Sequence, residues 1–192
     1  AIRHTVKSTI NTFANQFILA DNIDNAIKKS TDDSNKGIWF SFDMLGESAI
    51  SDDDADRYYT AYENAIKSLS AHNQKDAPIQ SQPGISVKLS AISPQIKTKY
   101  WHETINIVSE KLLKLAIMAH KANIQLTIDA EESWRLEISH AIIERVFSAP
   151  ELDDYNGFGI VIQAYLISAV DQCRWAIDLA MKNKKRLMVR LV

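Results

Sequence analysis

A chain of 192 residues, of which 46% are hydrophobic and 24% charged, has the composition of a globular domain and not of a disordered or collagen-like chain. The 22 Lys and Arg against 24 Asp and Glu give a formal net charge of -2. No block of five like charges occurs, which argues against a nucleic-acid-binding arm or a polybasic membrane patch. The one cysteine, Cys173, argues against a disulfide framework or a cysteine-based zinc site and fits a reducing compartment.

Two kinds of segment follow each other along the chain. Residues 1–36 predict an N-terminal helical arm, with apolar residues at helical spacing over 6–19 and a second short helix over 23–29. After Gly37, strands alternate with helices. The expected strands are 38–45, 85–89, 124–128, 160–164 and 187–192, and the expected helices are about 51–72, 101–120, 133–147 and 170–183.

This alternation of helices with short, nearly all apolar strands predicts an α/β fold with a parallel sheet that is buried on both faces. A doubly wound dinucleotide-binding sheet is disfavoured, because no G-x-G-x-x-G occurs and the Gly157-Phe158-Gly159 run precedes its strand. The pattern favours a (β/α)8 barrel of the TIM type over residues 37–192. Eight strands and about 250 residues are typical of that barrel. The chain also ends on an apolar run, so we expect a fragment truncated to about the first five βα units.

Polar or charged residues lie at or just beyond the end of each expected strand: Glu47, Lys88, Asp129, Gln163 and Arg190. In such barrels the reactive groups lie at the C-terminal ends of the strands, so these five residues are candidates for a shared site. Simpler alternatives exist for most of them. Lys88 and Asp129 could form a structural ion pair, Gln163 could satisfy a backbone group, and Glu47 could be a solvated charge. The histidines have no metal-ligand spacing, and no metal site is predicted.

Five strings in order carry a family resemblance: Phe42–Glu47, Gly84–Ala91, Ile128–Glu132, Val161–Tyr165 and Arg186–Val192. Together they resemble the proline dehydrogenase domain of the bifunctional bacterial flavoenzyme proline utilization A. The resemblance implies FAD-dependent oxidation of L-proline to Δ1-pyrroline-5-carboxylate, with electrons passed to a membrane quinone. It also implies a separate NAD-dependent dehydrogenase domain on the parent polypeptide, which completes proline catabolism to glutamate. A cytoplasmic parent protein, peripherally associated with the inner membrane, follows from the same resemblance.

The resemblance also assigns roles on the substrate side. Lys88 matches a lysine that helps to hold the substrate carboxylate, and Asp129 matches an acidic residue that orders the cationic groups beside substrate and flavin. Glu47 matches a carboxylate that positions an arginine over the substrate, and Leu191 matches an apolar wall of the proline pocket. Lys88, Asp129 and Arg190 are the candidate catalytic residues.

Four residues match cofactor-binding positions of the family. Besides Asp129, these are Gln163, at the edge of the isoalloxazine, Arg190, near the reactive nitrogen of the flavin, and Val192, which makes a backbone contact. A fixed cation such as Arg190 stabilises the negative charge that a flavin gains on reduction.

The sequence departs from the family in two loops and in extent. Residues 93–95 read Ser-Pro-Gln where the family usually has His-Pro-Arg, and residues 166–168 read Leu-Ile-Ser where it has Gln-Lys-Arg. The family's strongest substrate-binding arginines match no position of this chain. We therefore expect the isolated chain to be inactive and to bind FAD weakly or not at all. Open strand edges are expected to favour self-association.

An enzyme of another class is the competing hypothesis. A lysine at the end of a barrel strand can form a Schiff base with a carbonyl substrate, so Lys88 could also belong to an aldolase-like enzyme.

Overall fold

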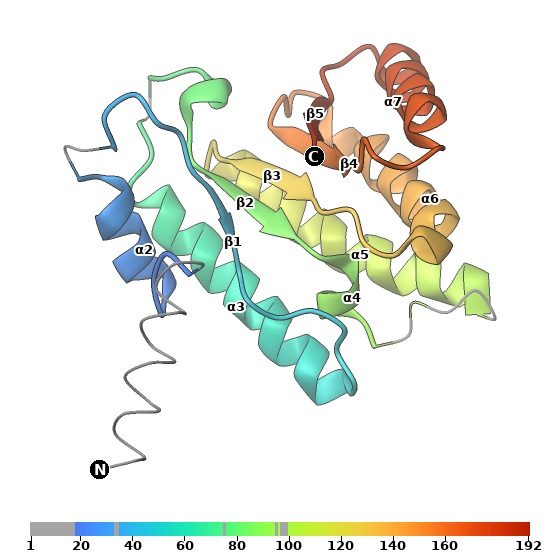
Figure 1. Ribbon diagram of the computed structural model, residues 1–192, viewed down its shortest axis with the longest axis horizontal. Coiled ribbons are helices and arrows are strands. Elements are labelled where there is room, and N and C mark those ends of the chain that lie inside the picture. The colour runs from blue at the N-terminus through green and yellow to red at the C-terminus, as the bar shows by residue number, and fades with distance from the viewer. Residues whose placement is uncertain (1–17, 33–34, 75, 95, 97–99) are drawn as a thin grey trace. The chain divides into compact units, whose positions relative to one another are not determined.

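The computed structural model describes residues 18–32, 35–74, 76–94, 96 and 100–192 (Figure 1). The chain divides into two compact units, Ala1–Phe40 and Ser41–Val192. In the first unit, helix α2 (Ile23–Ser30) begins after Asn22, whose side chain accepts a hydrogen bond from the Asn25 N–H at 2.9 Å. This agrees with the helix expected over 23–29. The helix expected over 6–19 lies almost entirely outside the described residues, and the domain boundary after residue 36 stays a prediction.

The second unit is built on one parallel sheet. Its strands are β1 (Ser41–Asp43), β2 (Gly84–Val87), β3 (Gln125–Ile128), β4 (Phe158–Ile162) and β5 (Met188–Leu191). They pair in the order β1-β2-β3-β4-β5, and every pair is parallel. The predicted α/β fold with five parallel strands is therefore confirmed. The sequential order also lacks the reversal that defines a doubly wound sheet.

Helices connect successive strands and pack against one another beside the sheet (Figure 1). The long ones are α3 (Asp52–Ser70), α5 (Trp101–Lys121), α6 (Leu136–Phe147) and α7 (Ala169–Asn183). Shorter turns are η2 (Ile79–Ser81), α4 (Leu89–Ile92), η4 (Ser133–Arg135) and η5 (Pro150–Leu152). The Ser51 hydroxyl caps α3 by accepting a hydrogen bond from the Asp54 N–H at 3.2 Å, and three aspartates fill the first turn, where negative charge is favourable. In the described ranges, no helix combines the length and apolar character that crossing a membrane requires.

The two faces of the sheet differ in chemistry. Because side chains alternate along a strand, the register places Ile85, Leu126 and Phe158 in one buried row, and Val87, Ile128 and Ile160 extend the same face. The opposite face carries a row of Asp43, Ser86, Thr127 and Gly159. The expected burial on both faces is confirmed for β2, β3 and β4, where even Ser86 and Thr127 on the polar face are buried, but not for β1 and β5, most of whose residues are exposed. Each strand is so short that its one or two polar positions do not register as an alternating pattern.

The exit of β2 also differs from the expectation. The strand ends at Val87 rather than at Leu89, and Leu89 opens the short helix α4, with Lys88 at its N-cap position. The Ala91 N–H donates to the Lys88 carbonyl at 3.1 Å, which turns the chain immediately after the strand. Lys88 therefore lies at the point where the strand leaves the sheet.

Candidate functional site

Four charged side chains form a continuous network on the polar face of the sheet. Lys88 Nζ donates to Asp43 Oδ1 at 2.6 Å and to Asp129 Oδ2 at 2.9 Å. The Arg190 guanidinium donates to the other oxygen of Asp129, Oδ1, at 2.5 Å and to the Ser86 hydroxyl at 3.3 Å. The strands β1, β2, β3 and β5 thus each contribute one charge within or beside their C-terminal end, and negative and positive groups alternate from Asp43 to Arg190.

Asp129 is the centre of this network. Its side chain is 11% exposed, and the Lys88 side chain is 15% exposed, whereas those of Arg190 and Asp43 are 42% and 53% exposed. Both oxygens of Asp129 are engaged by cations, so its carboxylate fixes the positions of Lys88 and Arg190 relative to each other. The structural ion pair between Lys88 and Asp129, which was one alternative from the sequence, is present. It is part of a larger network, because Asp43 of β1 binds Lys88 and Arg190 of β5 binds Asp129.

The charge of Lys88 is strongly favoured by its surroundings. Burial by itself lowers the pKa of Lys88, but hydrogen bonds to Asp43 and Asp129 and the attraction of both carboxylates outweigh burial and raise that pKa above its ordinary value. A lysine that forms a Schiff base must attack as the neutral amine. The environment of Lys88 works against that form, and the aldolase-like alternative is not favoured.

A buried tyrosine fixes the backbone at Lys88. The Tyr62 side chain comes from α3, is 1% exposed, and its hydroxyl oxygen accepts a hydrogen bond from the Lys88 N–H at 3.1 Å. Burial raises the pKa of Tyr62 to about 12, although the hydrogen bond from Lys88 opposes this shift. The phenol thus stays neutral and holds the backbone at the end of β2 through this hydrogen bond.

A second set of hydrogen bonds ties the loop after β1 to the exits of β2 and β3. The Glu131 carboxylate accepts hydrogen bonds from the Ser90 hydroxyl and from the Ser90 N–H, the latter at 3.2 Å. The Ser90 hydroxyl oxygen accepts from the Ser48 N–H at 3.0 Å, and the Ser90 carbonyl accepts from the Ala49 N–H at 2.8 Å. Burial raises the pKa of Glu131, and these hydrogen bonds oppose that shift. Because Glu47 directly precedes Ser48, the same bonds limit where Glu47 can lie.

An open cleft of about 260 Å³ lies over these strand ends. Its lining residues are Glu47, Ser48, Lys88, Ser90, Ala130, Glu131, Glu132 and Gln163. Three of the predicted site residues therefore line one cleft: Glu47, Lys88 and Gln163. Asp129 binds Lys88, and Arg190 binds Asp129, so both are linked to the cleft through Lys88. The cleft is large enough for a small amino acid, and its walls carry both signs of charge.

The last two predicted residues lie apart from this cleft. Leu191 is an exposed residue of β5 whose side chain points to the face opposite that of Arg190. The Val192 N–H donates to the Ile162 carbonyl at 3.1 Å, and the Val192 carbonyl accepts from the Ala164 N–H at 2.8 Å. The roles that the resemblance assigns to Leu191 and Val192 stay predictions.

Sequence reasoning missed four residues that shape the site: Asp43, Ser86, Glu131 and Tyr62. Glu131 follows Asp129 closely, so the rule that strand ends carry the chemistry selects it, but Asp43 lies inside the first expected strand, 38–45, and ends only the shorter observed strand β1. Ser86 and Tyr62 carry no such signal. Their roles depend on which strand and which helix lie beside them.

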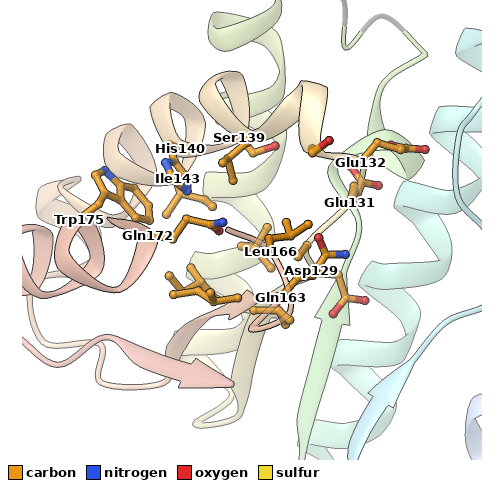
Figure 2. Close-up of a pocket in the computed structure, with 17 residues that line it drawn as sticks. Asp129, Glu131, Glu132, Ser139, His140, Ile143, Gln163, Leu166, Gln172 and Trp175 are labelled. Atoms are coloured by element: carbon orange, nitrogen blue, oxygen red, sulfur yellow. The ribbon is translucent and has the colours of Figure 1, made fainter. Parts of the chain in front are cut away.

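A smaller cavity, of about 30 Å³, lies between α6, α7 and the ends of β3 and β4 (Figure 2). His140 of α6 and Trp175 of α7 stack in it with ring centroids 3.8 Å apart and an angle of 6° between the rings. Burial lowers the pKa of His140 to about 4. Asp129, Glu131 and Glu132 line the same cavity nearer the strand ends.

His140 is expected to make the stability of the fold depend on pH. With a folded-state pKa of about 4 against about 6.5 when unfolded, the unfolded chain binds more protons between these values. The free energy of unfolding should therefore fall as the pH drops from 6.5 to 4, by about 2 kcal/mol for a partly buried ring. Urea unfolding at several pH values measures the free energy of unfolding. The difference in its pH dependence between wild type and His140→Gln separates the contribution of His140 from that of the carboxylates. The exposed His72→Gln should keep the wild-type slope, and a His140→Gln slope equal to that of wild type would contradict the prediction.

Among the residues that the structure describes, no group of three or more His, Cys, Asp or Glu side chains is arranged to hold a metal ion.

Comparisons with known proteins agree with this geometry. The family model described as "Proline dehydrogenase" matches residues 26–192. The "Bifunctional protein PutA" of Escherichia coli is 37% identical over all 192 residues, which span 14% of that protein. The "Proline dehydrogenase 1" of Bacillus subtilis is 25% identical over 166 residues, covering 86% of this chain and 49% of that protein.

Solved structures of proline utilization A give the same result. The chain aligns with the Bradyrhizobium japonicum protein at a TM-score of 0.80 and 35% identity, over 90% of this chain and 18% of that one. With the Bdellovibrio bacteriovorus protein the TM-score is 0.91 over the whole chain and 21% of that protein, and at 24% identity this likeness shows the fold alone. The family model spans most of the sequence, including every strand of the sheet and all the residues of the charged network. The chain therefore belongs to the proline dehydrogenase family.

Proposed function

We propose that this chain is part of an FAD-dependent proline dehydrogenase that oxidises L-proline to Δ1-pyrroline-5-carboxylate. The observation that carries the proposal is the network of Asp43, Lys88, Asp129 and Arg190 beside an open cleft, in a chain of this family. A small zwitterion needs a cation for its carboxylate, and Lys88, which the network holds in place, supplies one in the cleft.

On the substrate side, Lys88 presents a fixed positive charge to the carboxylate of proline. Asp129 holds Lys88 and Arg190 in place, and the hydrogen bonds between Glu131, Ser90 and Ser48 position the loop that carries Glu47. In this proposal Glu47 orients a further cation over the substrate. The resemblance also gives Leu191 the role of an apolar wall, although its side chain points to the face of β5 opposite that of Arg190.

The residues around the cleft also fit a flavin. Gln163 lines the open cleft. Arg190, which is linked to the cleft through Asp129 and Lys88, is partly exposed, so both side chains have donors for ring carbonyls and nitrogens. FAD, when bound, would act as the oxidant: it would accept a hydride from the ring carbon next to the nitrogen of proline, and the nitrogen would lose a proton as the C–N single bond becomes a double bond. The positive charge of Arg190 stabilises negative charge that develops next to it. The hydrogen bond to Asp129 holds the Arg190 guanidinium in one position. Val192 would add a backbone contact.

The wider setting belongs to the same proposal. The chain spans 14% of the Escherichia coli relative, whose name describes a bifunctional protein. We place an NAD-dependent dehydrogenase domain on the parent polypeptide, a membrane quinone as electron acceptor, and a cytoplasmic protein that associates peripherally with the inner membrane. The sequential strand order supports a (β/α)8 barrel of which this chain forms about the first five units.

The deciding experiment follows the visible spectrum of a form of the protein that carries flavin. Addition of L-proline should bleach the yellow absorption, and an electron-accepting dye should restore it with turnover. A spectrum that L-proline leaves unchanged would contradict the proposal. Borohydride trapping of a carbonyl compound on Lys88 would instead favour the aldolase-like enzyme.

The isolated chain of 192 residues is expected to show no proline-dependent dye reduction and weak or no FAD binding. The motivation is that the substrate-clamping arginines of the family match no position in this sequence. Robust turnover by the purified chain would contradict this. Light scattering tests whether the open edges at β1 and β5 cause self-association, as predicted.

A further inference from the structure

The two carboxylates on Lys88 are not equivalent. Asp129 is 11% exposed and also holds Arg190, so removing it from Lys88 disturbs two buried or half-buried cations. Asp43 is 53% exposed and has Lys88 as its charged partner at 2.6 Å. Ion pairs of exposed carboxylates contribute little to stability. Asp43 is therefore the group that leaves Lys88 more easily.

The charge balance makes this difference matter for a ligand. The network holds two cations, Lys88 and Arg190, and two anions, Asp43 and Asp129, so it is neutral without a ligand. A carboxylate that approaches Lys88 adds a third anion within a few ångströms of Asp43, and like charges at that distance repel. The new carboxylate can take the place of Asp43, because it offers Lys88 the same oxygen ligands.

We propose that Asp43 is an internal competitor for the substrate carboxylate. In the free protein its carboxylate holds the position on Lys88 that the carboxylate of a small amino acid takes, and it moves into solvent when that ligand binds. Asp43 thereby sets the affinity for the substrate. It also sets a preference for acids over amides, since a neutral carboxamide cannot replace an anion on Lys88. The identity of the ligand as L-proline rests on the proposed function. The displacement of Asp43 from Lys88 by a carboxylate does not.

The first test is binding of a simple carboxylate, which needs no turnover. Sodium acetate is titrated into the chain, and the NMR signal of the Lys88 N–H, which Tyr62 holds in place, is followed. The Asp43→Asn variant should bind acetate about three- to tenfold more tightly than wild type, because a competing anion is gone. Acetamide should leave the signal unchanged in wild type. The exposed Asp171→Asn, on α7, serves as the matched control and should bind acetate as wild type does.

The second test is kinetic and uses the flavin-loaded protein. Asp43→Asn should lower the KM for L-proline about three- to tenfold, and raised salt should reduce the difference between the KM values of variant and wild type. A residue that merely supports Lys88 would give the opposite result, a higher KM. A higher KM, or equal acetate affinity in Asp43→Asn and wild type, would overturn the inference. If the flavin-loaded wild-type protein fails to oxidise proline but Asp43→Asn still binds acetate more tightly, the proposed function fails and the displacement stands.

Discussion

Replacing Asp129 with alanine is expected to lower the free energy of unfolding by about 2 to 4 kcal/mol, because the substitution leaves a buried cation without its partner. Both oxygens of Asp129 are engaged, one by Lys88 at 2.9 Å and the other by Arg190 at 2.5 Å. Without that carboxylate, Lys88 keeps only the exposed Asp43, and the two cations repel each other across the vacated position. In the flavin-loaded protein kcat/KM for L-proline should fall at least about 100-fold, since both cations lose their fixed positions.

Urea unfolding of wild type and variants measures the stability effect. Asp171→Ala, which removes an exposed partner of Arg174, should cost less than about 0.5 kcal/mol and serves as the control. A double variant, Lys88→Met with Asp129→Leu, should recover part of the loss, because it removes a buried anion and cation together. A loss for Asp129→Ala no larger than that for Asp171→Ala would show that the network does not stabilise the fold.

Gln82→Ala is expected to destabilise the protein by about 3 kcal/mol, because a fully buried amide that pairs with the backbone is lost. The Gln82 side chain is 1% exposed and lies between α3 and β2, at the end of the sheet away from the cleft. Its Oε1 accepts from the Gln74 N–H at 3.0 Å, and its Nε2 donates to the Gln74 carbonyl and, at 3.1 Å, to the Ala77 carbonyl. The side chain thus replaces the backbone partners that this irregular segment lacks.

The control for this prediction is Gln80→Ala, two residues earlier. The Gln80 side chain is exposed, and the Gln80 carbonyl, which the substitution keeps, accepts a hydrogen bond from the Gln125 amide at 3.2 Å. Its removal should change the unfolding free energy by less than about 0.5 kcal/mol. Thermal unfolding of both variants checks the pair, and we expect the midpoint of Gln82→Ala to fall by several degrees while that of Gln80→Ala stays near wild type. Equal midpoints would show that the segment does not depend on the buried amide.

Local pattern was sufficient to find the elements of this fold. The capping serine and acidic first turn of α3, and the apolar periodicity of α5, lie where the sequence predicts them, because both features act within a few residues. The short apolar strands were found for the same reason. The helical turn at α4 was missed, since its residues, Leu89–Ile92, are as buried and apolar as those of the strand before them.

The candidate site was found in part, and the residues that were found share one property. Lys88, Asp129, Gln163 and Arg190 stand out because each is polar at the end of an apolar run, which a sequence displays directly. Asp43 and Tyr62 do not stand out in this way. Their importance comes from contact with Lys88, which is 45 residues from Asp43 and 26 from Tyr62 along the chain.

The order of the strands and helices, the family, and the charged residues at the strand ends can be found in the amino-acid sequence alone, since these depend on local patterning and residue type. The expected strands were longer than the observed ones, and β1 has three residues instead of the expected eight. Which charges meet depends on the packing of the strands. Strand pairing in the order β1 to β5 places Asp43 beside Lys88 and Arg190 beside Asp129, and those neighbours determine which carboxylate is buried and which is exposed. The physical reason is that an ion pair depends on distance and on shielding from water, and both are set by the packing of segments that lie far apart in the sequence.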